Sequence, residues 1–195
     1  MEKVIVVATS NQHKLKEIAQ IFSDYRIISM QSLGFNQEIE ENGLTFQENA
    51  IIKAKTVSSA LNVTALADDS GLCVDALNGA PSIYSARYSG VNGERQDKAN
   101  RELLLKNLQG VDDRTAYFES CVALCFNDGR IITASGRTYG KILLSEKGNN
   151  GFGYDNIFYS DELNKGFGEA TDEEKNRVSH RAKALNLLSK KLQED

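Results

Sequence analysis

The sequence is poor in several features that define whole classes of protein. Among its 195 residues are three cysteines, an odd number with no Cys-x-x-Cys pair, and a single proline, Pro81. This cysteine pattern argues against a disulfide framework and against a zinc ribbon. We therefore expect reduced, mostly buried thiols in a continuously folded chain that has no linker.

Long apolar runs and an excess of basic charge are also lacking. The β-branched run at residues 4–7 is too short for the apolar region of a signal peptide or for a membrane span. The formal net charge of −4 disfavours nucleic-acid polymers, because phosphate backbones are bound by an excess of Lys and Arg. We therefore expect a cytoplasmic protein of one domain, residues 1–195, that binds neither membranes nor nucleic acid.

Hydrophobic periodicity predicts both strands and helices. Residues 4–8 are typical of a buried strand, and Leu15, Ile18, Ala19 and Phe22 have the spacing of an amphipathic helix. The other predicted elements are a helix at 46–61 begun by a Thr45 to Glu48 capping box, strands at 63–67 and 72–76 around a bend, a helix around Leu104, a hairpin of strands 116–126 and 131–139, a short strand at 157–159 and a C-terminal helix through Leu188. This mixture predicts an α/β fold with a mixed sheet.

A polar segment between the first strand and the first helix is a candidate phosphate site. Free backbone N–H groups and the positive end of a helix dipole favour an anion there, and Lys14 adds a cation. The alternative is that Ser10 or Asn11 only caps the helix and that Lys14 is solvated. The whole segment is Thr9-Ser10-Asn11-Gln12-His13-Lys14.

Carboxylates at three positions are candidate metal ligands. Asp68 and Asp69 lie between two hydrophobic runs, where adjacent like charges are costly unless a cation or several donors compensate them. Carboxylate oxygens suit Mg²⁺, which commonly bridges to substrate phosphates. One glutamate of the acidic cluster Glu38, Glu40 and Glu41 completes the site if its loop folds over the phosphates. Otherwise the aspartates occupy an exposed turn and the cluster is a solvated loop.

Two further segments are candidates for binding a nucleobase. The glycine-rich run at 148–155 includes Phe152-Gly153-Tyr154-Asp155, in which an aromatic ring could stack on a base. Lys175, His180 and Arg181 supply hydrogen-bond donors that would favour a base with a carbonyl oxygen over one with an amino group. An ordinary glycine-rich turn and a charged helix surface are the simpler alternatives.

Taken together, six motifs in matching order closely resemble the inosine/xanthosine triphosphate pyrophosphatases, and the resemblance covers the whole chain. The motifs are Thr9-Ser10-Asn11-x-x-Lys14, Glu41-Asn42-Gly43-x-Thr45-Phe46-x-Glu48-Asn49-Ala50, Ala67-Asp68-Asp69-Ser70-Gly71-Leu72, Gly79-Ala80-Pro81-x-x-Tyr84-Ser85-Ala86-Arg87-Tyr88, Gly151-Phe152-Gly153-Tyr154-Asp155 and Ser179-His180-Arg181.

The resemblance implies an elongated central mixed β-sheet flanked by helices, two lobes around a substrate cleft, and a homodimer. It also implies hydrolysis of ITP, dITP and XTP to the monophosphate and pyrophosphate. Thr9 to Lys14 would bind the phosphates. Glu41 and Asp69, assisted by Asp68, would hold Mg²⁺, and Asp69 would accept the proton of the attacking water.

The base and sugar would be contacted by the second half of the chain. By the same resemblance, Ser70 would touch the substrate, Phe152 to Asp155 would contact the base and sugar, and Phe152 would stack on the purine. Lys175, His180 and Arg181 would read its 6-oxo edge, which agrees with their donor chemistry. The alternatives are a related pyrophosphatase for another modified nucleotide and a nucleotide-binding regulator without catalysis.

The chain departs from the family pattern in one loop. Gly148-Asn149-Asn150-Gly151 replaces the frequent Gly-Thr-Gly-Gly, and Asn156 stands where proline is usual. The loss of proline predicts a less rigid loop.

Overall fold

The structure is a computed structural model that describes residues 3–194. Met1, Glu2 and Asp195 of the predicted domain therefore lie outside the described residues. Within the described part of the chain, no helix is both long enough and apolar enough to cross a membrane.

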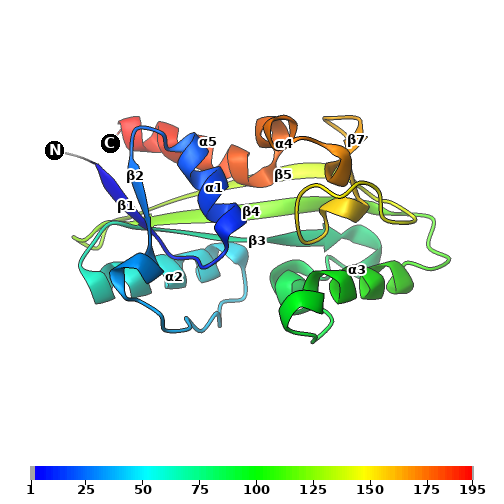
Figure 1. Cartoon of the computed structure of the whole chain (residues 1–195), viewed down its shortest axis with the longest axis horizontal. Coiled ribbons are helices and arrows are strands. Elements are labelled where there is room, and N and C mark those ends of the chain that lie inside the picture. Colours follow the sequence, from blue (N-terminus) through cyan, green and yellow to red (C-terminus); the bar gives the residue numbers. More distant parts are fainter. Residues whose placement is uncertain (1–2, 195) are drawn as a thin grey trace. The chain divides into compact units, whose positions relative to one another are not determined.

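Within the described residues, seven strands form one mixed sheet in the order β2-β1-β3-β4-β5-β6-β7. Strand β1 is parallel to both β2 and β3, whereas β6 is antiparallel to β5 and β7. This confirms the predicted α/β fold with a mixed sheet (Figure 1). The strands are β1 (Val4–Val7), β2 (Arg26–Ser29), β3 (Ala65–Val74), β4 (Thr115–Cys125), β5 (Ile131–Ile142), β6 (Phe158–Ser160) and β7 (Lys165–Gly166).

Helices accompany the strands along the chain. The α-helices are α1 (Gln12–Ile21), α2 (Phe46–Leu61), α3 (Gln96–Asn107), α4 (Asp172–Val178) and α5 (His180–Glu194). Short 3-10 helices occupy Met30–Leu33, Asp75–Leu77, Ser82–Arg87, Gly93–Arg95, Asp155–Ile157 and Phe167–Glu169.

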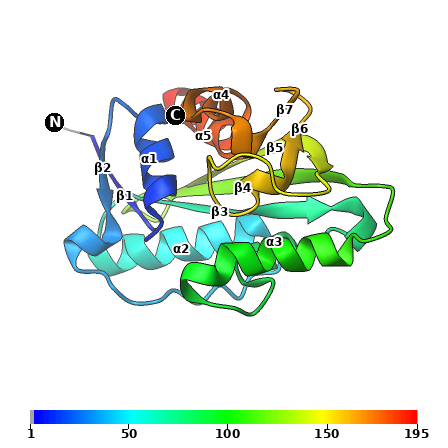
Figure 2. The ribbon, with the colours of Figure 1, turned by 45° about the vertical axis from the view of Figure 1, so that its right-hand side comes forward.

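The chain divides into two compact units, and the first contains the residues up to Asp69, Ser120–Gly136 and those from Arg181 onward. Its strands alternate strictly between two cores, because successive side chains of a strand point to opposite faces. Ile5 of β1 packs with residues of α1 and α5, and its neighbour Val6 packs with residues of α2. Figures 1 and 2 accordingly show α1 and α5 on one side of β1 and β3, and α2 on the other.

The second unit contains Ser70–Glu119 and Arg137–His180. Its core joins apolar side chains of β3, β4, β5, β6 and α3 with three aromatic rings, those of Phe118, Phe158 and Phe167. Helix α3 also supports the 3-10 helix Ser82–Arg87, since the side-chain amide of Asn100 donates to the carbonyl of Ala86 at 2.9 Å. The two units match the predicted pair of lobes, while the elongation and the substrate cleft stay predictions.

Several predicted elements are confirmed, whereas others differ from the prediction. Helix α2 has the predicted bounds, but strands β2 and β7 and helix α4 were missed, and Ala19 is exposed. The capping box at Thr45 is half formed: Thr45 accepts the N–H of Glu48 at 3.1 Å, whereas the Glu48 carboxylate accepts the N–H of Leu44. The predicted bend is absent, since β3 continues from Ala65 to Val74 through both aspartates.

Candidate active site

The segment between β1 and α1 is shaped by short hydrogen bonds. Asn11 is the N-cap of α1, and its Oδ1 accepts the N–H groups of His13 and Lys14 at 2.9 and 3.2 Å. The Thr9 hydroxyl accepts the N–H of Asn11 at 3.1 Å. The capping alternative is therefore correct for Asn11, but Lys14 is not solvated, because its side chain is only 16% exposed. Ser10, Gln12 and His13 are not buried.

Lys14 pairs with the first aspartate of the acidic pair. Its Nζ lies 2.6 Å from Asp68 Oδ2, and the hydroxyl of Ser120 in β4 donates to Asp68 Oδ1 at 2.5 Å. Arg181 Nε of α5 lies 3.4 Å from the same Oδ1. Burial opposes the charge of this carboxylate, but Arg181 and Lys14 outweigh that effect and hold the pKa of Asp68 well below its usual range. Burial, in turn, lowers the pKa of Lys14.

Glu17 of α1 adds a second carboxylate to the group formed by Lys14, Asp68 and Arg181. Glu17 lies one turn after Lys14, and its carboxylate pairs with Nη1 of Arg181. The side chains of Arg181 and Asp68 are 2% and 0% exposed, whereas that of Glu17 is 12% exposed. Two cations, Lys14 and Arg181, thus face two anions, Asp68 and Glu17, which is the compensation that a buried charge requires.

Asp69 faces the other side of β3, as the next residue of a strand must. There Lys53 of α2 places Nζ at 3.0 Å from Asp69 Oδ1 and at 3.0 Å from Glu41 Oε1. The amide of Asn49, one turn earlier in α2, donates to Asp69 Oδ2 at 3.2 Å. Burial raises the pKa of Asp69 despite the attraction of Lys53. For Lys53 the two carboxylates outweigh burial, so its pKa is raised.

The backbone of the acidic loop before α2 is hydrogen-bonded to Asn49, the residue of α2 that also contacts Asp69. The N–H of Gly43 donates to Asn49 Oδ1 at 2.8 Å. A Cβ on Gly43 would lie 2.7 Å from that same oxygen, so only glycine fits. Asn49 therefore holds both Asp69 and the loop that carries Glu41, and Glu41 and Asp69 share the ammonium of Lys53. Glu41 is not part of a fully solvated loop, since its side chain is 28% exposed.

Lys53 and Asn49 are functional candidates that we did not single out from the sequence. The available signal was helical spacing. On α2, Asn49 and Lys53 are four residues apart on the face that also carries the buried residues Ala50, Ala54 and Val57. A lysine at a position that the periodicity assigns to the core needs a partner, and this one has two.

The carboxylates Glu41 and Asp69 fit a magnesium ion. Within residues 3–194, no three or more His, Cys, Asp or Glu side chains are gathered closely enough to form a metal cage. Mg²⁺ seldom uses such a cage, since it is usually held by one or two carboxylates together with substrate phosphates and water. Glu41 and Asp69 already converge on one cationic group, the ammonium of Lys53, and Asp69 retains 10% exposure of its side chain. Asp68, in contrast, is fully buried against its cations.

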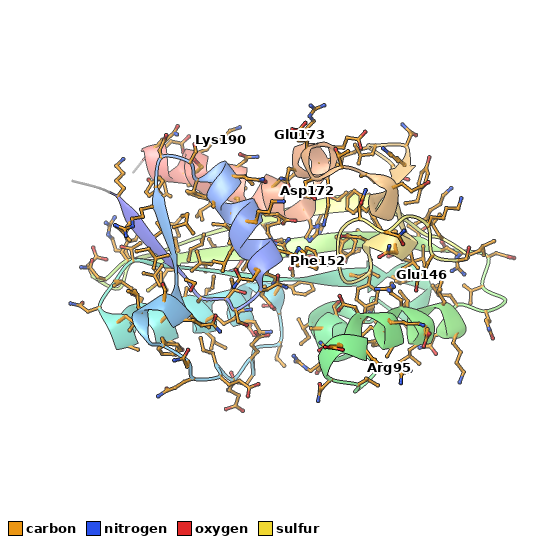
Figure 3. All side chains as sticks on the ribbon, viewed as in Figure 1. Arg95, Glu146, Phe152, Asp172, Glu173 and Lys190 are labelled. Atoms are coloured by element: carbon orange, nitrogen blue, oxygen red, sulfur yellow. The ribbon has the colours of Figure 1, made fainter. Side chains whose placement is uncertain are left out.

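The glycine-rich segment between β5 and β6 carries Phe152 (Figure 3). Asp155 organises it: Oδ2 accepts the N–H of Phe152 at 2.9 Å and the ammonium of Lys175 at 2.7 Å. That ammonium also lies 4.6 Å from the centroid of the Phe152 ring. Lys175, Asp155 and the half-buried Phe152 are therefore brought together, with the ammonium at cation–π distance from the ring.

The other predicted base-contacting residues have different surroundings. The Tyr154 side chain is buried in the core, where its hydroxyl donates to the carbonyl of Ser85 at 2.7 Å. The His180 ring is buried and stacks on Phe118, with 4.8 Å between the centroids. Ser70 follows Asp69 in β3 and is half-buried. Arg181 is the residue described above with Asp68 and Glu17.

The departures in this segment bring contacts of their own. The side-chain amide of Asn156 donates to the carbonyl of Gly148 at 2.6 Å. The backbone carbonyl of Asn156 accepts the N–H of Lys147 at 2.8 Å. The Asn150 amide donates to the carbonyl of Ala170 at 3.0 Å. Proline and glycine could not supply these side-chain donors. The expected loss of rigidity therefore stays a prediction, with these bonds acting against it.

Known proteins resemble this chain over nearly its whole length. The Ham1 family model matches residues 5–191. A dITP/XTP pyrophosphatase of Haemophilus influenzae is 46% identical over 98% of this chain and 100% of its own, and one of Staphylococcus aureus is 44% identical over 99% and 98%.

Solved structures of the same family also resemble this chain. The Ham1 protein of Staphylococcus aureus is 44% identical, with a TM-score of 0.88 over 98% of this chain and 99% of its own. A HAM1 protein of Coxiella burnetii is 39% identical, with a TM-score of 0.89 over 99% and 100%. Sequence and fold thus agree over nearly the full length, and the chain belongs to the Ham1 family.

Proposed function

We propose that this chain hydrolyses the deaminated purine nucleotides ITP, dITP and XTP to the monophosphate and pyrophosphate, with Mg²⁺ as cofactor. The observation that carries the proposal is the convergence of Lys53, Asp69 and Glu41, with Nζ at 3.0 Å from a carboxylate oxygen of each. Relatives of more than 40% identity named dITP/XTP pyrophosphatase support the choice of substrate.

The triphosphate would bind at the start of α1. Backbone N–H groups of the first turn and the helix dipole favour an anion, and Lys14 and Lys53 supply cations. Each lysine already has an aspartate partner in β3, so the ammonium groups are oriented before the substrate arrives. Such fixed charges stabilise a transferring phosphoryl group without reorganisation.

Asp69 would accept a proton from the attacking water. The oxygen of that water bonds to the α-phosphorus, the bond from this phosphorus to the oxygen that bridges to the β-phosphate breaks, and pyrophosphate leaves. The Asp69 carboxylate suits a general base by its position, since its side chain keeps 10% exposure and lies beside the ammonium of Lys53. Asn49 keeps the carboxylate in place through its 3.2 Å hydrogen bond.

Glu41 and Asp69 would hold the magnesium ion. When bound, Mg²⁺ neutralises phosphate charge and makes the phosphorus a better electrophile. We assign Asp68 the supporting role of a buried counter-ion for Lys14 and Arg181, since these cations and Ser120 surround its two oxygens.

The base would stack on Phe152, and Lys175, His180 and Arg181 would donate to its 6-oxo edge. Hypoxanthine and xanthine accept such bonds, whereas the amino group of adenine faces the donors with another donor. Ser70 and the backbone of Gly153 to Asp155 would contact the rest of the nucleoside.

The test is a substrate panel with purified protein. ITP, dITP, XTP, ATP, GTP and dTTP are incubated with Mg²⁺ or with EDTA, and the products are separated by chromatography. We expect monophosphate and pyrophosphate from the first three substrates only, and only with Mg²⁺. Release of inorganic phosphate instead would contradict the site of cleavage.

Adding a modified pyrimidine triphosphate and a methylated triphosphate to the panel separates the alternatives. Faster hydrolysis of either added substrate would indicate a related pyrophosphatase, and binding of ITP without turnover would indicate a regulator. The homodimer, the cytoplasmic location and the lack of a nucleic-acid partner remain predictions. Size-exclusion chromatography and a DNA-binding assay test the first and the last.

A further inference from the structure

Helix α3 contacts the segment around Phe152 through two side chains of opposite charge. Asp97 Oδ2 accepts the N–H of Gly153 at 2.9 Å. Arg101, one turn later, donates from Nη1 to the carbonyl of the same glycine at 2.8 Å. Both backbone groups of the residue after Phe152 are therefore held from one helix.

Arg101 also reaches the beginning of the segment. Its Nε lies 3.0 Å from Glu146 Oε1, and its Nη2 donates to Glu146 Oε2 at 3.4 Å. Glu146 and Phe152 both belong to the connection between β5 and β6 (Figure 3). One guanidinium, 13% exposed, thus ties two points that are seven residues apart, which a planar fork of donors permits and a single ammonium does not.

The rest of the segment is fixed by its own contacts. Asp155 holds the N–H of Phe152, and Gly153 has φ +60°, a conformation that favours glycine. The two peptide groups beside Phe152 set the direction in which its side chain leaves the backbone. One of these is fixed by Asp155, and the other is fixed by α3.

We propose that Asp97 and Arg101 are positioning residues that orient Phe152 for stacking on the nucleobase, and this rests on the proposed function. Neither residue touches the base or the phosphates. Their loss should weaken binding of the nucleoside part and leave the chemistry of the triphosphate unchanged, because the groups that contact the phosphates are other residues.

The variants Asp97→Asn and Arg101→Lys test this with little change in size. Asn keeps an oxygen acceptor but loses the charge, and Lys keeps the charge but loses the fork. Glu102→Gln is the matched control, since Glu102 is an exposed α3 residue whose carboxylate lies 3.8 Å from the ammonium of Lys98. Circular dichroism and thermal unfolding establish that each variant is folded.

Steady-state kinetics with ITP and inhibition by IMP and by pyrophosphate are then measured. Arg101→Lys should raise KM for ITP and the inhibition constant of IMP by about tenfold, since a backbone carbonyl loses a charged donor. Asp97→Asn should raise both in the same direction, and kcat and inhibition by pyrophosphate should not change. A merely structural role would not separate the two inhibitors.

Three outcomes are decisive. Wild-type turnover combined with unchanged KM and IMP inhibition in both variants overturns this inference alone. A fall in kcat, or an equal loss for IMP and pyrophosphate, also overturns it. Absence of pyrophosphate release from ITP by the wild type overturns the proposed function, and the present inference with it.

Discussion

Lys53 Nζ and Asp69 Oδ1 lie 3.0 Å apart, on the side of β3 opposite to the pair formed by Lys14 and Asp68. Each aspartate of the adjacent pair therefore has its own lysine from a different helix. The reason is the alternation of a strand, which sends Asp68 toward α1 and α5 and sends Asp69 toward α2.

Replacing Lys53 by methionine tests the first of these pairs. Lys53→Met leaves Glu41 and Asp69 close together without their cation, and the lost phosphate contact should lower kcat/KM for ITP by about 100-fold. The free energy of unfolding without Mg²⁺ should fall by about 2 kcal/mol, below the value for fully buried pairs because Glu41 is partly exposed. Kinetics and urea denaturation measure the two effects.

Lys55→Met is the matched control for this prediction, because Lys55 lies on the same helix and is exposed. It should leave both quantities almost unchanged. Equal effects of the two substitutions would contradict the role of Lys53.

The two aspartates should respond differently to the same substitution. Asp69→Asn removes the proton acceptor and should lower kcat by at least about 100-fold with the fold intact. Asp68→Asn leaves Lys14 and Arg181 buried without their shared counter-ion, which should cost about 3 kcal/mol of the free energy of unfolding.

Urea denaturation and ITP turnover of both variants check this division. Asp75→Asn, an exposed position just after β3, is the control for stability. If Asp68→Asn is as stable as the wild type, the buried counter-ion role is wrong.

Gly151 is required by the geometry of the glycine-rich segment that carries Phe152. It has φ +76°, and a Cβ would lie 2.1 Å from Asp155 Oδ2, the atom that holds Phe152. Gly151→Ala should therefore displace that carboxylate, raise KM for ITP and lower the free energy of unfolding by about 2 kcal/mol.

Gly129→Ala is the comparison for this prediction. Gly129 also has a positive φ, +89°, but no atom lies within 4 Å of its added Cβ. The substitution should cost about 1 kcal/mol of backbone strain and leave KM unchanged. A rise in KM only for Gly151→Ala would support the contact, and equal KM values would contradict it.

Asn156 should stabilise the loop that it closes. Asn156→Ala removes the amide that donates to the Gly148 carbonyl at 2.6 Å, at a cost of about 1 kcal/mol. Hydrogen exchange of the amides of residues 147–150 should become faster. Asn149→Ala, at an exposed position in the same loop, should change neither measurement.

Local signals in the sequence determined most elements of the fold. The bounds of α2 follow from the Thr45 cap and the apolar periodicity after it, and the β4–β5 hairpin follows from the Asp128-Gly129 turn between two strand-like runs. The N-terminal phosphate-binding candidate was found in the same way. Such signals need no knowledge of distant residues, because caps, turns and periodicity act within a few positions.

Tertiary packing decided which charges compensate each other. Two adjacent aspartates suggested a bend, since a strand through the core could not carry them unpaired; β3 continues because Lys14, Lys53 and Arg181 arrive from three helices. These cations lie between 16 and 113 residues along the chain from their aspartate partners, as Lys53 with Asp69 and Arg181 with Asp68 show. Ion pairs over such separations form only when the sheet brings its helices together, so the cations that balance the carboxylates came from the structure.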